Sequence, residues 1–373
     1  MVSKTVGRYF TLMAIVLGMS VIVGCGGGGS DTTEVIGISQ GRWGHTATLL
    51  EDGRVLVVGG QKTASGKLDT AEIFDPSTPS WSSAGSMAEK RGAGHTATLL
   101  EDGRVLVTGD SDEATAELYD PATGQWSSAG VMVWPRNWST ATLLEDGRVL
   151  VAGGLDATKA GAEPLAAVEI YDPFTGEWSP TSSMEQKNAK HNAVLMEDGK
   201  VMLVGQFLTE MYDSSTGNWS SAGKPSRERS AGTTATLLKN GKILVTGGEF
   251  QRGGWTGVAK APLRSTDSYD PSTGIWTVAS PMNETRVFHS AIQFQDGNVL
   301  VVASLELEMY DSTTDTWAPA GNMIQERDMM HTATLLVDGR VLIVGGKGEN
   351  EAGRLEGLNA VEIYDPATFT EEN

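Results

Sequence analysis

One stretch of sequence recurs along most of this chain, and this repetition limits the fold more than any other feature. The segment GHTATLLEDGRVLVVGG, which begins at Gly44, returns almost unchanged as GHTATLLEDGRVLVTGD from Gly94. Its turn, an Asp or Asn followed by Gly, occurs seven times, at Asp52, Asp102, Asp146, Asp198, Asn240, Asp296 and Asp338. These turns are 42 to 56 residues apart, a period that indicates an array of similar structural units.

Each repeat predicts four short antiparallel strands. An alternating run leads into the DG or NG turn, which favours a type I′ hairpin, and a second apolar run follows it. After a variable loop, a third strand ends in an aromatic residue followed by Asp, and in six repeats a Trp comes seven residues after that aromatic. The aromatics are Phe74, Tyr119, Tyr171, Tyr212, Tyr269, Tyr310 and Tyr364, and the tryptophans are Trp81, Trp126, Trp178, Trp219, Trp276 and Trp317. The repeats therefore predict an all-β protein, a seven-bladed β-propeller with four-stranded antiparallel blades.

The seventh repeat has no Trp strand of its own. The sequence ends at Asn373, soon after Tyr364, whereas residues 35–39 stand just ahead of the first repeat, where the end of a Trp strand would lie. We expect residues 35–39 to complete the last blade, so that the ring closes between the two ends of the chain and no sheet edge is left open. The predicted propeller spans residues 33–373.

The first 24 residues have the pattern of a secretory signal peptide. Lys4 and Arg8 form a charged region, residues 9–23 are mostly apolar, and the segment ends at the chain's one cysteine, Cys25. The sequence IVGC resembles a bacterial lipobox, which implies that Cys25 is lipidated and that residues 25–32 are a Gly-rich linker. We therefore expect a lipid-anchored protein of the cell envelope, with the outer membrane or cell surface favoured. An uncleaved anchor or a free thiol is the alternative.

The charge of the chain excludes one class of partner. The formal net charge is −19, and loss of residues 1–24 removes only Lys4 and Arg8, which leaves −21. A domain this acidic does not hold polyanions by bulk attraction, so nucleic acid is not an expected partner.

The repeat resembles a known family. Over residues 35–366 the repeat is similar to the kelch repeat in its diglycine after the second strand, its Tyr-Asp pair and its Trp seven residues later. Its sequence is closest to that of galactose oxidase-like propellers. This resemblance implies a domain that binds proteins or glycans; a minority of such propellers are enzymes, among them copper-radical oxidases and sialic acid mutarotases.

The residues do not carry the oxidase signature over. In those oxidases a His at the start of the first strand binds copper, a Tyr precedes it, and a second Tyr is cross-linked to Cys. Here the histidines stand in that slot without a preceding Tyr, and Cys25 is expected to be lipidated. The five histidines are His45, His95, His191, His289 and His331. We expect them to do a repeated structural job, such as hydrogen-bonding a neighbouring loop, and we predict no metal site and no cofactor.

Candidate ligand-binding residues come from the loops between the second and third strands and from those between blades, because these two sets share one face and carry most of the variation. A basic residue precedes nearly every first strand: Arg42, Arg91, Arg136, Lys190, Arg229, Arg286 and Arg327. These residues could form a cationic collar at the channel mouth, or each could pair with an acidic residue or carbonyl of its own blade. Trp43, Trp134, Trp138 and Trp255 lie outside the repeat position, with Arg252 near the last of them. Such tryptophans suit stacking on sugars, anchoring a protein partner, or simply packing the loops.

These patterns favour a non-enzymatic, envelope-anchored recognition module that binds a glycan or a protein through the loop face. The candidate contacts are Trp43, Trp134, Arg136, Trp138, Arg252, Trp255, Arg286 and Arg327. The alternative is a carbohydrate-active enzyme of the mutarotase or lyase kind, acting on an acidic sugar at the same face.

Overall fold

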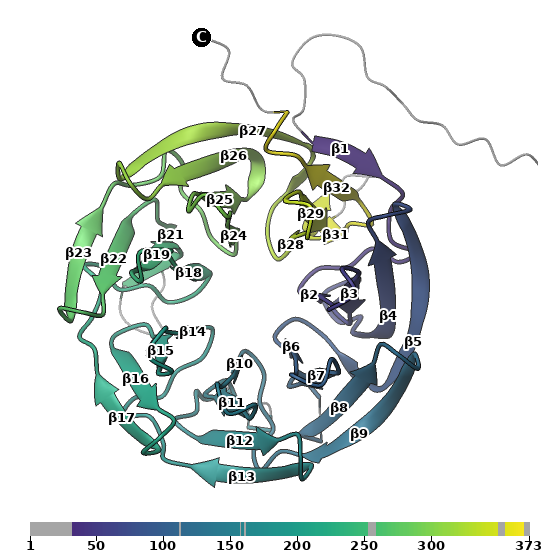
Figure 1. The fold of residues 1–373 in the computed structure, drawn as a ribbon, viewed down its shortest axis with the longest axis horizontal. Coiled ribbons are helices and arrows are strands. Elements are labelled where there is room, and N and C mark those ends of the chain that lie inside the picture. Colours follow the sequence, from purple (N-terminus) through teal and green to yellow (C-terminus); the bar gives the residue numbers. More distant parts are fainter. Residues whose placement is uncertain are drawn as a thin grey trace, which may run out of the picture.

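The protein is a closed ring of seven four-stranded antiparallel sheets, as predicted (Figure 1). The computed structural model describes residues 32–111, 113–156, 158–159, 162–252, 259–349 and 355–368, and within these ranges the regular elements are all strands. In each blade the first strand lies nearest the ring axis and the fourth lies on the rim (Figure 1). No helix in the described ranges is long and apolar enough to cross a membrane.

The strands follow the repeats in order. The first blade has β2 (Thr46–Leu49), β3 (Val55–Val58), β4 (Leu68–Asp75) and β5 (Ser80–Arg91); the second has β6 (Thr96–Leu99), β7 (Val105–Thr108), β8 (Thr115–Asp120) and β9 (Gln125–Val131); the third has β10 (Thr140–Leu143), β11 (Val149–Ala152), β12 (Val168–Asp172) and β13 (Glu177–Thr181); the fourth has β14 (Asn192–Leu195), β15 (Val201–Val204), β16 (Thr209–Asp213) and β17 (Asn218–Ser221). The fifth has β18 (Thr233–Leu237), β19 (Ile243–Gly247), β22 (Thr266–Asp270) and β23 (Ile275–Ala279); the sixth has β24 (Ser290–Gln293), β25 (Val299–Val302), β26 (Ser304–Asp311) and β27 (Thr316–Arg327); the seventh has β28 (Thr332–Leu335), β29 (Val341–Val344), β32 (Val361–Tyr364) and β1 (Thr32–Val35). Two hairpins, β20 (Glu249–Arg252) with β21 (Ala259–Pro262) and β30 (Lys347–Glu349) with β31 (Leu355–Gly357), project from the long loops of the fifth and seventh blades.

The core lies between blades. The second strand of each blade, VLVV in the first, is buried along its whole length because it has a neighbouring sheet on both sides. A typical core cluster joins Leu56 and Val58 of one blade to Val105, Val107 and Tyr119 of the next. Burial is therefore shared by neighbours, which explains why the repeats need one another to fold.

The hairpin turns differ from the prediction of a two-residue type I′ turn. Gly53 has a φ of 84°, but Asp52 is not among the residues with positive φ. The amide of Gly53 donates to the carbonyl of Leu50, and the amide of Leu50 donates to the carbonyl of Arg54. This pattern is a type I turn followed by a left-handed glycine, which forms a three-residue loop. Asp52 stabilises it by accepting the Arg54 amide at 3.0 Å.

The ring closes as predicted, but with different residues. The closing strand is β1, Thr32–Val35, which pairs antiparallel with β32 in the register Thr32↔Tyr364 to Val35↔Val361 (Figure 1). Residues 36–39, most of the predicted segment, instead carry the chain toward the first blade, and the Ile38 amide donates to the carbonyl of Asn359. The spacing between Trp and Arg in the other blades predicts the position of this closing strand. Trp81 stands ten residues before Arg91, and Thr32 stands ten residues before Arg42.

The repeated tryptophans join each blade to the one before it. The indole Nε1–H of Trp126 donates to the carbonyl of Ala84 at 2.8 Å, and that of Trp178 donates to the carbonyl of Ala129 at 2.8 Å. Each indole also packs against its own blade's third-strand aromatic; the Trp126 and Tyr119 ring centroids are 5.1 Å apart. The regular spacing of the tryptophans in the sequence therefore reflects this contact between neighbouring blades.

Candidate functional site

The mouth of the central channel is built from one residue per blade, the residue just before the first strand's His slot. All seven have a positive φ, between 52° and 114°: Gly44, Gly94, Trp138, Lys190, Gly232, Phe288 and Met330. Backbone bonds link neighbours, because the amide of Trp138 donates to the carbonyl of Gly94 at 2.8 Å and the amide of Lys190 donates to that of Trp138 at 3.0 Å. Glycine suits this left-handed conformation, whereas a bulky side chain adopts it at a cost of order 1–3 kcal/mol.

Four of these positions carry large side chains in spite of that cost. Trp138 of the third blade and Phe288 of the sixth approach across the ring axis, with ring centroids 6.2 Å apart and planes inclined at 52°. The Lys190 ammonium lies 5.0 Å from the centroid of the Trp138 ring. Trp138, Lys190 and Met330 line a cavity of about 220 Å³, together with four of the histidines. An aromatic pair and a cation thus occupy the channel mouth, and all three side chains are partly exposed.

Two further candidate tryptophans are also half-buried and each lies beneath a cation. The Lys347 ammonium is 5.7 Å from the centroid of the Trp43 ring, and the Arg136 guanidinium carbon is 5.7 Å from that of Trp134. Trp43 also forms a bridge with Gln61 of the first blade's long loop. These two tryptophans therefore pack loops and keep only part of their rings accessible.

Four of the five histidines, His45, His95, His191 and His289, join neighbouring blades beneath the mouth, the kind of structural job expected of them. The Nε2 atom of His45 lies 2.9 Å from the Thr332 hydroxyl, and that of His191 lies 3.0 Å from the Thr140 hydroxyl. Burial lowers the pKa of His95 to about 4 and that of His191 to about 3. The rings are therefore neutral near pH 7.

The repeated arginines lie inside the blades and form buried ion pairs. Arg136 donates to Glu169 at 2.6 Å, and both side chains have an exposed fraction of 0%. The same guanidinium donates to the carbonyls of Gly153 and Ala167, and Glu169 also accepts the amide of Val133. Each ion pair thus holds the segment that enters a blade against the third strand of that blade. The six pairs are Arg42–Glu72, Arg91–Glu117, Arg136–Glu169, Arg229–Asp267, Arg286–Glu308 and Arg327–Glu362.

This placement corrects the idea of a cationic collar. Arg136, Arg286 and Arg327 are 1%, 4% and 0% exposed, so their guanidinium groups cannot reach a ligand at the channel mouth. The physical reason is that desolvated charges need partners, and each of these arginines, which precede the first strand of a blade, has a carboxylate on the third strand of that blade.

Lys190 does not belong to the arginine series. Trp178 is ten residues before Asn188, so Asn188 occupies the arginine slot of the fourth blade and Lys190 occupies the slot of Trp138. The carboxylate of that blade, Glu210, is buried and accepts the amide of Glu185 at 2.6 Å. Burial raises the pKa of Glu210 above its ordinary value.

The acidic partners could have been found in the sequence. An acidic residue stands two positions before the third-strand aromatic in every repeat: Glu72, Glu117, Glu169, Glu210, Asp267, Glu308 and Glu362. A buried third strand with an in-phase carboxylate favours an in-phase cation, and six of the seven blades have one.

Three of the predicted residues are not placed by the structure. Trp255 and Cys25 lie outside the described residues, and Arg252 is described only by its backbone in β20. The ligand contacts proposed for Trp255 and Arg252 and the lipidation proposed for Cys25 therefore stay predictions.

The ring, the indole contacts between blades and the repeated buried side chains define a β-propeller of repeated blades. Sequence comparison matches the Kelch motif at residues 52–88, 146–185 and 253–283. The chain is 23% identical to Kelch-like protein 35 of Mus musculus over 210 residues, 54% of this chain and 34% of that protein. It is 32% identical to galactose oxidase of Gibberella zeae over 111 residues, 28% of this chain and 15% of that protein. The matches thus cover well under half of these relatives.

A solved structure shares the fold. A fungal alcohol oxidase with catalytic diversity among the AA5 family, in complex with copper, superposes with a TM-score of 0.73 at 19% identity, over 92% of this chain and 78% of that one. This chain is thus a seven-bladed β-propeller that carries Kelch motifs and is similar in fold to the alcohol oxidase.

The copper site of such an oxidase does not fit the residues at this channel mouth. The part of the chain that the structure describes holds no group of three His, Cys, Asp or Glu side chains placed to share a metal ion. His45, His95, His191 and His289 each direct Nε2 at a threonine hydroxyl of the neighbouring blade.

Proposed function

We propose that this protein is a non-enzymatic recognition module that binds a protein or a glycan through its channel-mouth face while a lipid on Cys25 holds it at the cell envelope. Kelch propellers generally bind protein partners, and this scaffold resembles them in fold and repeat. The observation that carries the proposal is the partly exposed Trp138–Phe288 pair, because two bulky aromatics occupy backbone positions that favour glycine. Strained residues with accessible aromatic surface are typical of binding sites.

The surroundings of the pair support binding rather than catalysis. The aromatic rings offer flat apolar surface, Lys190 offers a cation at its edge, and Trp43 and Trp134 add partly exposed indole on the same face. The enzymatic alternative relied on the arginines to hold an acidic sugar, and Arg136, Arg286 and Arg327 are buried in ion pairs.

The test compares two aromatic substitutions on opposite faces of the disc. Trp138→Ala removes the channel-mouth indole, whereas Phe174→Ala removes a side chain that is 97% exposed. Phe174 lies in the turn between β12 and β13, on the opposite face of the propeller. Both proteins and the unchanged chain are applied to a polysaccharide array and used in cross-linking and pull-down from envelope fractions. A central aromatic contributes about 2 kcal/mol or more to an interface, so Trp138→Ala should weaken binding about thirtyfold while Phe174→Ala leaves it unchanged.

The two arms separate the partner classes. Array binding lost in Trp138→Ala supports a glycan, and a cross-linked protein lost in the same variant supports a protein. A partner held equally by wild type and Trp138→Ala would overturn the proposed face. The anchor is tested apart from it: Cys25→Ser should abolish metabolic labelling with a fatty acid and release the protein from the membrane fraction.

A further inference from the structure

Six of the seven contact layers between neighbouring blades contain an indole. Trp126, for example, packs on the cluster of Leu50, Ala84 and Tyr119, where the first and second blades meet. The corresponding tryptophans of the other layers are Trp81, Trp178, Trp219, Trp276 and Trp317. Among the described residues, the layer between the sixth and seventh blades contains Phe294, Ala320 and Tyr364 but no Trp.

The reason is the way in which the ring closes. In the other blades the Trp is opposite the third-strand aromatic, as in the register Tyr119↔Trp126. In the seventh blade β1 supplies the fourth strand, and the residue opposite Tyr364 is Thr32. A threonine cannot fill the volume of an indole, so ring closure by the N-terminal strand leaves this layer without one, and the second aromatic of the layer is Phe294, which stands where the first blade has Leu50.

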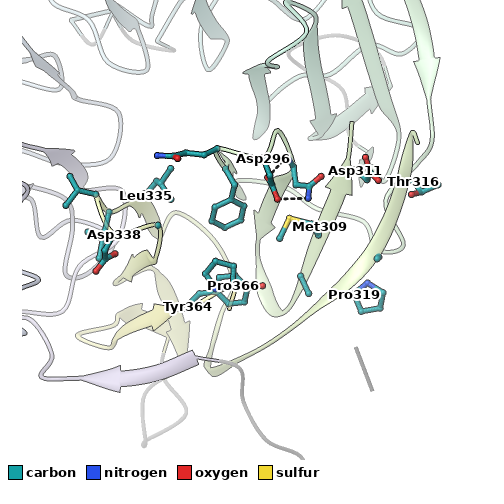
Figure 2. Close-up of a pocket in the computed structure, with 17 residues that line it drawn as sticks. Asp296, Met309, Asp311, Thr316, Pro319, Leu335, Asp338, Tyr364 and Pro366 are labelled. Carbon is teal, nitrogen blue, oxygen red and sulfur yellow. Dashed lines mark hydrogen bonds between the residues drawn. The ribbon is translucent and has the colours of Figure 1, made fainter. Parts of the chain in front are cut away.

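A cavity of about 780 Å³ lies at this place (Figure 2). Tyr364 and Pro366 line it from the seventh blade, and Met309 and Pro319 line it from the sixth, as Figure 2 shows. Its volume falls within the range of about 300–1,000 Å³ found for small-molecule sites. It opens beside the tight turns, on the face opposite the channel mouth.

The walls also include Ala320, the residue that corresponds in sequence to the indole acceptors of two other layers. Trp126 donates to the carbonyl of Ala84, the third residue after Trp81, and Trp178 donates to that of Ala129, the third residue after Trp126. The third residue after Trp317 is Ala320, which lines the cavity.

The rim of the cavity is acidic. Asp296, Asp311 and Asp338 line it, and no Lys or Arg is among its described lining residues (Figure 2). Asp338 is paired with Arg340, an exposed neighbour. Asp311 accepts the amide and hydroxyl of Thr313, hydrogen bonds that lower its pKa to about 2. Asp311 is therefore ionised across the physiological range.

We propose that this cavity binds a small aromatic cation, an indole-like ring that carries an ammonium group. The ring occupies the place that Trp fills in the other six layers, its N–H donates toward the Ala320 carbonyl, and the ammonium group lies toward Asp296 and Asp311. Three features of the ligand match three features of the site: the ring matches the missing indole, the N–H matches the sequence position of Ala320, and the ammonium group matches the carboxylates. The site is separate from the channel mouth, so it stands or falls independently of the proposed function.

Calorimetric titration of the full chain with tryptamine and with indole-3-propionate tests the proposal, because the two probes share the ring and differ in the sign of the charge. Tryptamine should bind at least tenfold more tightly. Thr32→Trp places an indole in the missing position and should weaken tryptamine binding at least tenfold. Trp138→Ala, at the other site, should leave it unchanged.

Two more variants keep the result interpretable. Trp126→Ala vacates an indole position in another layer and should gain a second tryptamine site, which shows that the assay detects this kind of cavity. Phe369→Ala tests whether the chain itself is the occupant, since Phe369 lies just beyond the described residues and five positions after Tyr364. Binding by Phe369→Ala but not by wild type would assign the cavity to the tail and overturn the proposal. Binding that survives Thr32→Trp, or that is lost in Trp138→Ala, would overturn it as well.

Discussion

Trp138 and Phe288 come from blades on opposite sides of the ring and contact each other over its axis, with centroids 6.2 Å apart. Both have left-handed backbones, at φ values of 59° and 52°. The first, second and fifth blades have Gly44, Gly94 and Gly232 in the same slot. The backbone of the slot is thus fixed by the blade, and the side chain is free to serve another purpose.

The mismatch between the left-handed backbone and the bulky side chain of Trp138 predicts an unusual order of stabilities among variants at this position. Trp138→Gly should be more stable than Trp138→Ala by about 1 kcal/mol, because glycine adopts a positive φ without the Cβ clash. Urea unfolding of the two variants measures the difference. The same pair of substitutions at Thr140, which lies in β10, should give the opposite order, and an equal or reversed order at position 138 would mean that the slot is not strained.

The buried ion pairs should be costly to break. Arg136→Gln leaves the carboxylate of Glu169 buried without its cation and should reduce the free energy of unfolding by about 3–5 kcal/mol. Arg148→Gln, which breaks the Arg148–Asp146 pair with side chains 37% and 45% exposed, should cost less than about 1 kcal/mol. Chemical denaturation of both variants provides the comparison. Similar losses in the two would show that burial does not govern these pairs.

The buried histidines predict a loss of stability in acid. Burial lowers the pKa of His191 to about 3, whereas an unfolded histidine has a pKa of about 6.5. Above pH 6.5 the ring is neutral in both states and has no effect. As the pH falls toward 3, only the unfolded chain takes up the proton, so stability decreases by about 1.4 kcal/mol per pH unit for this residue.

His191→Ser isolates that contribution, because Ser139 fills the same slot in the third blade. At pH 8 the variant should be less stable by about 1 kcal/mol, the value of the lost hydrogen bond to Thr140. Below about pH 5 it should be more stable than wild type. Unfolding curves measured from pH 8 to 4.5 should therefore cross, and parallel curves would contradict a depressed pKa.

Ring closure predicts a cost for losing β1. Deletion of Thr32–Val35 exposes the edge of β32 and removes its antiparallel partner. At about 1 kcal/mol for each of two to four backbone hydrogen bonds, the free energy of unfolding should decrease by about 2–4 kcal/mol, and the open edge should promote self-association. Thr33→Ala with Glu34→Ala changes exposed side chains and keeps the strand, so it should stay within about 0.5 kcal/mol of wild type. Calorimetry and light scattering measure both effects.

The sequence alone determined the number of blades, the order of strands and the contact between blades. The turn Gly, the third-strand aromatic and the Trp recur in phase because each blade must solve the same packing problem against its neighbour. The in-phase carboxylates, exemplified by Glu169, were equally visible and would have predicted the partner of Arg136. The Trp-to-Arg spacing would likewise have placed Thr32 in the closing strand.

Only the tertiary structure decided which side chains meet. Trp138 and Phe288 are 150 positions apart in the sequence and occupy the same slot of different blades, but the repeat does not specify which of the seven slots meet, so their contact follows from the curvature that closes the ring. The cavity beside Tyr364 has the same origin, because it exists only where β1 of one chain end pairs with β32 of the other. A repeat fixes local pairings through its period, whereas contacts across the axis and at the closure depend on how all seven blades are arranged in space.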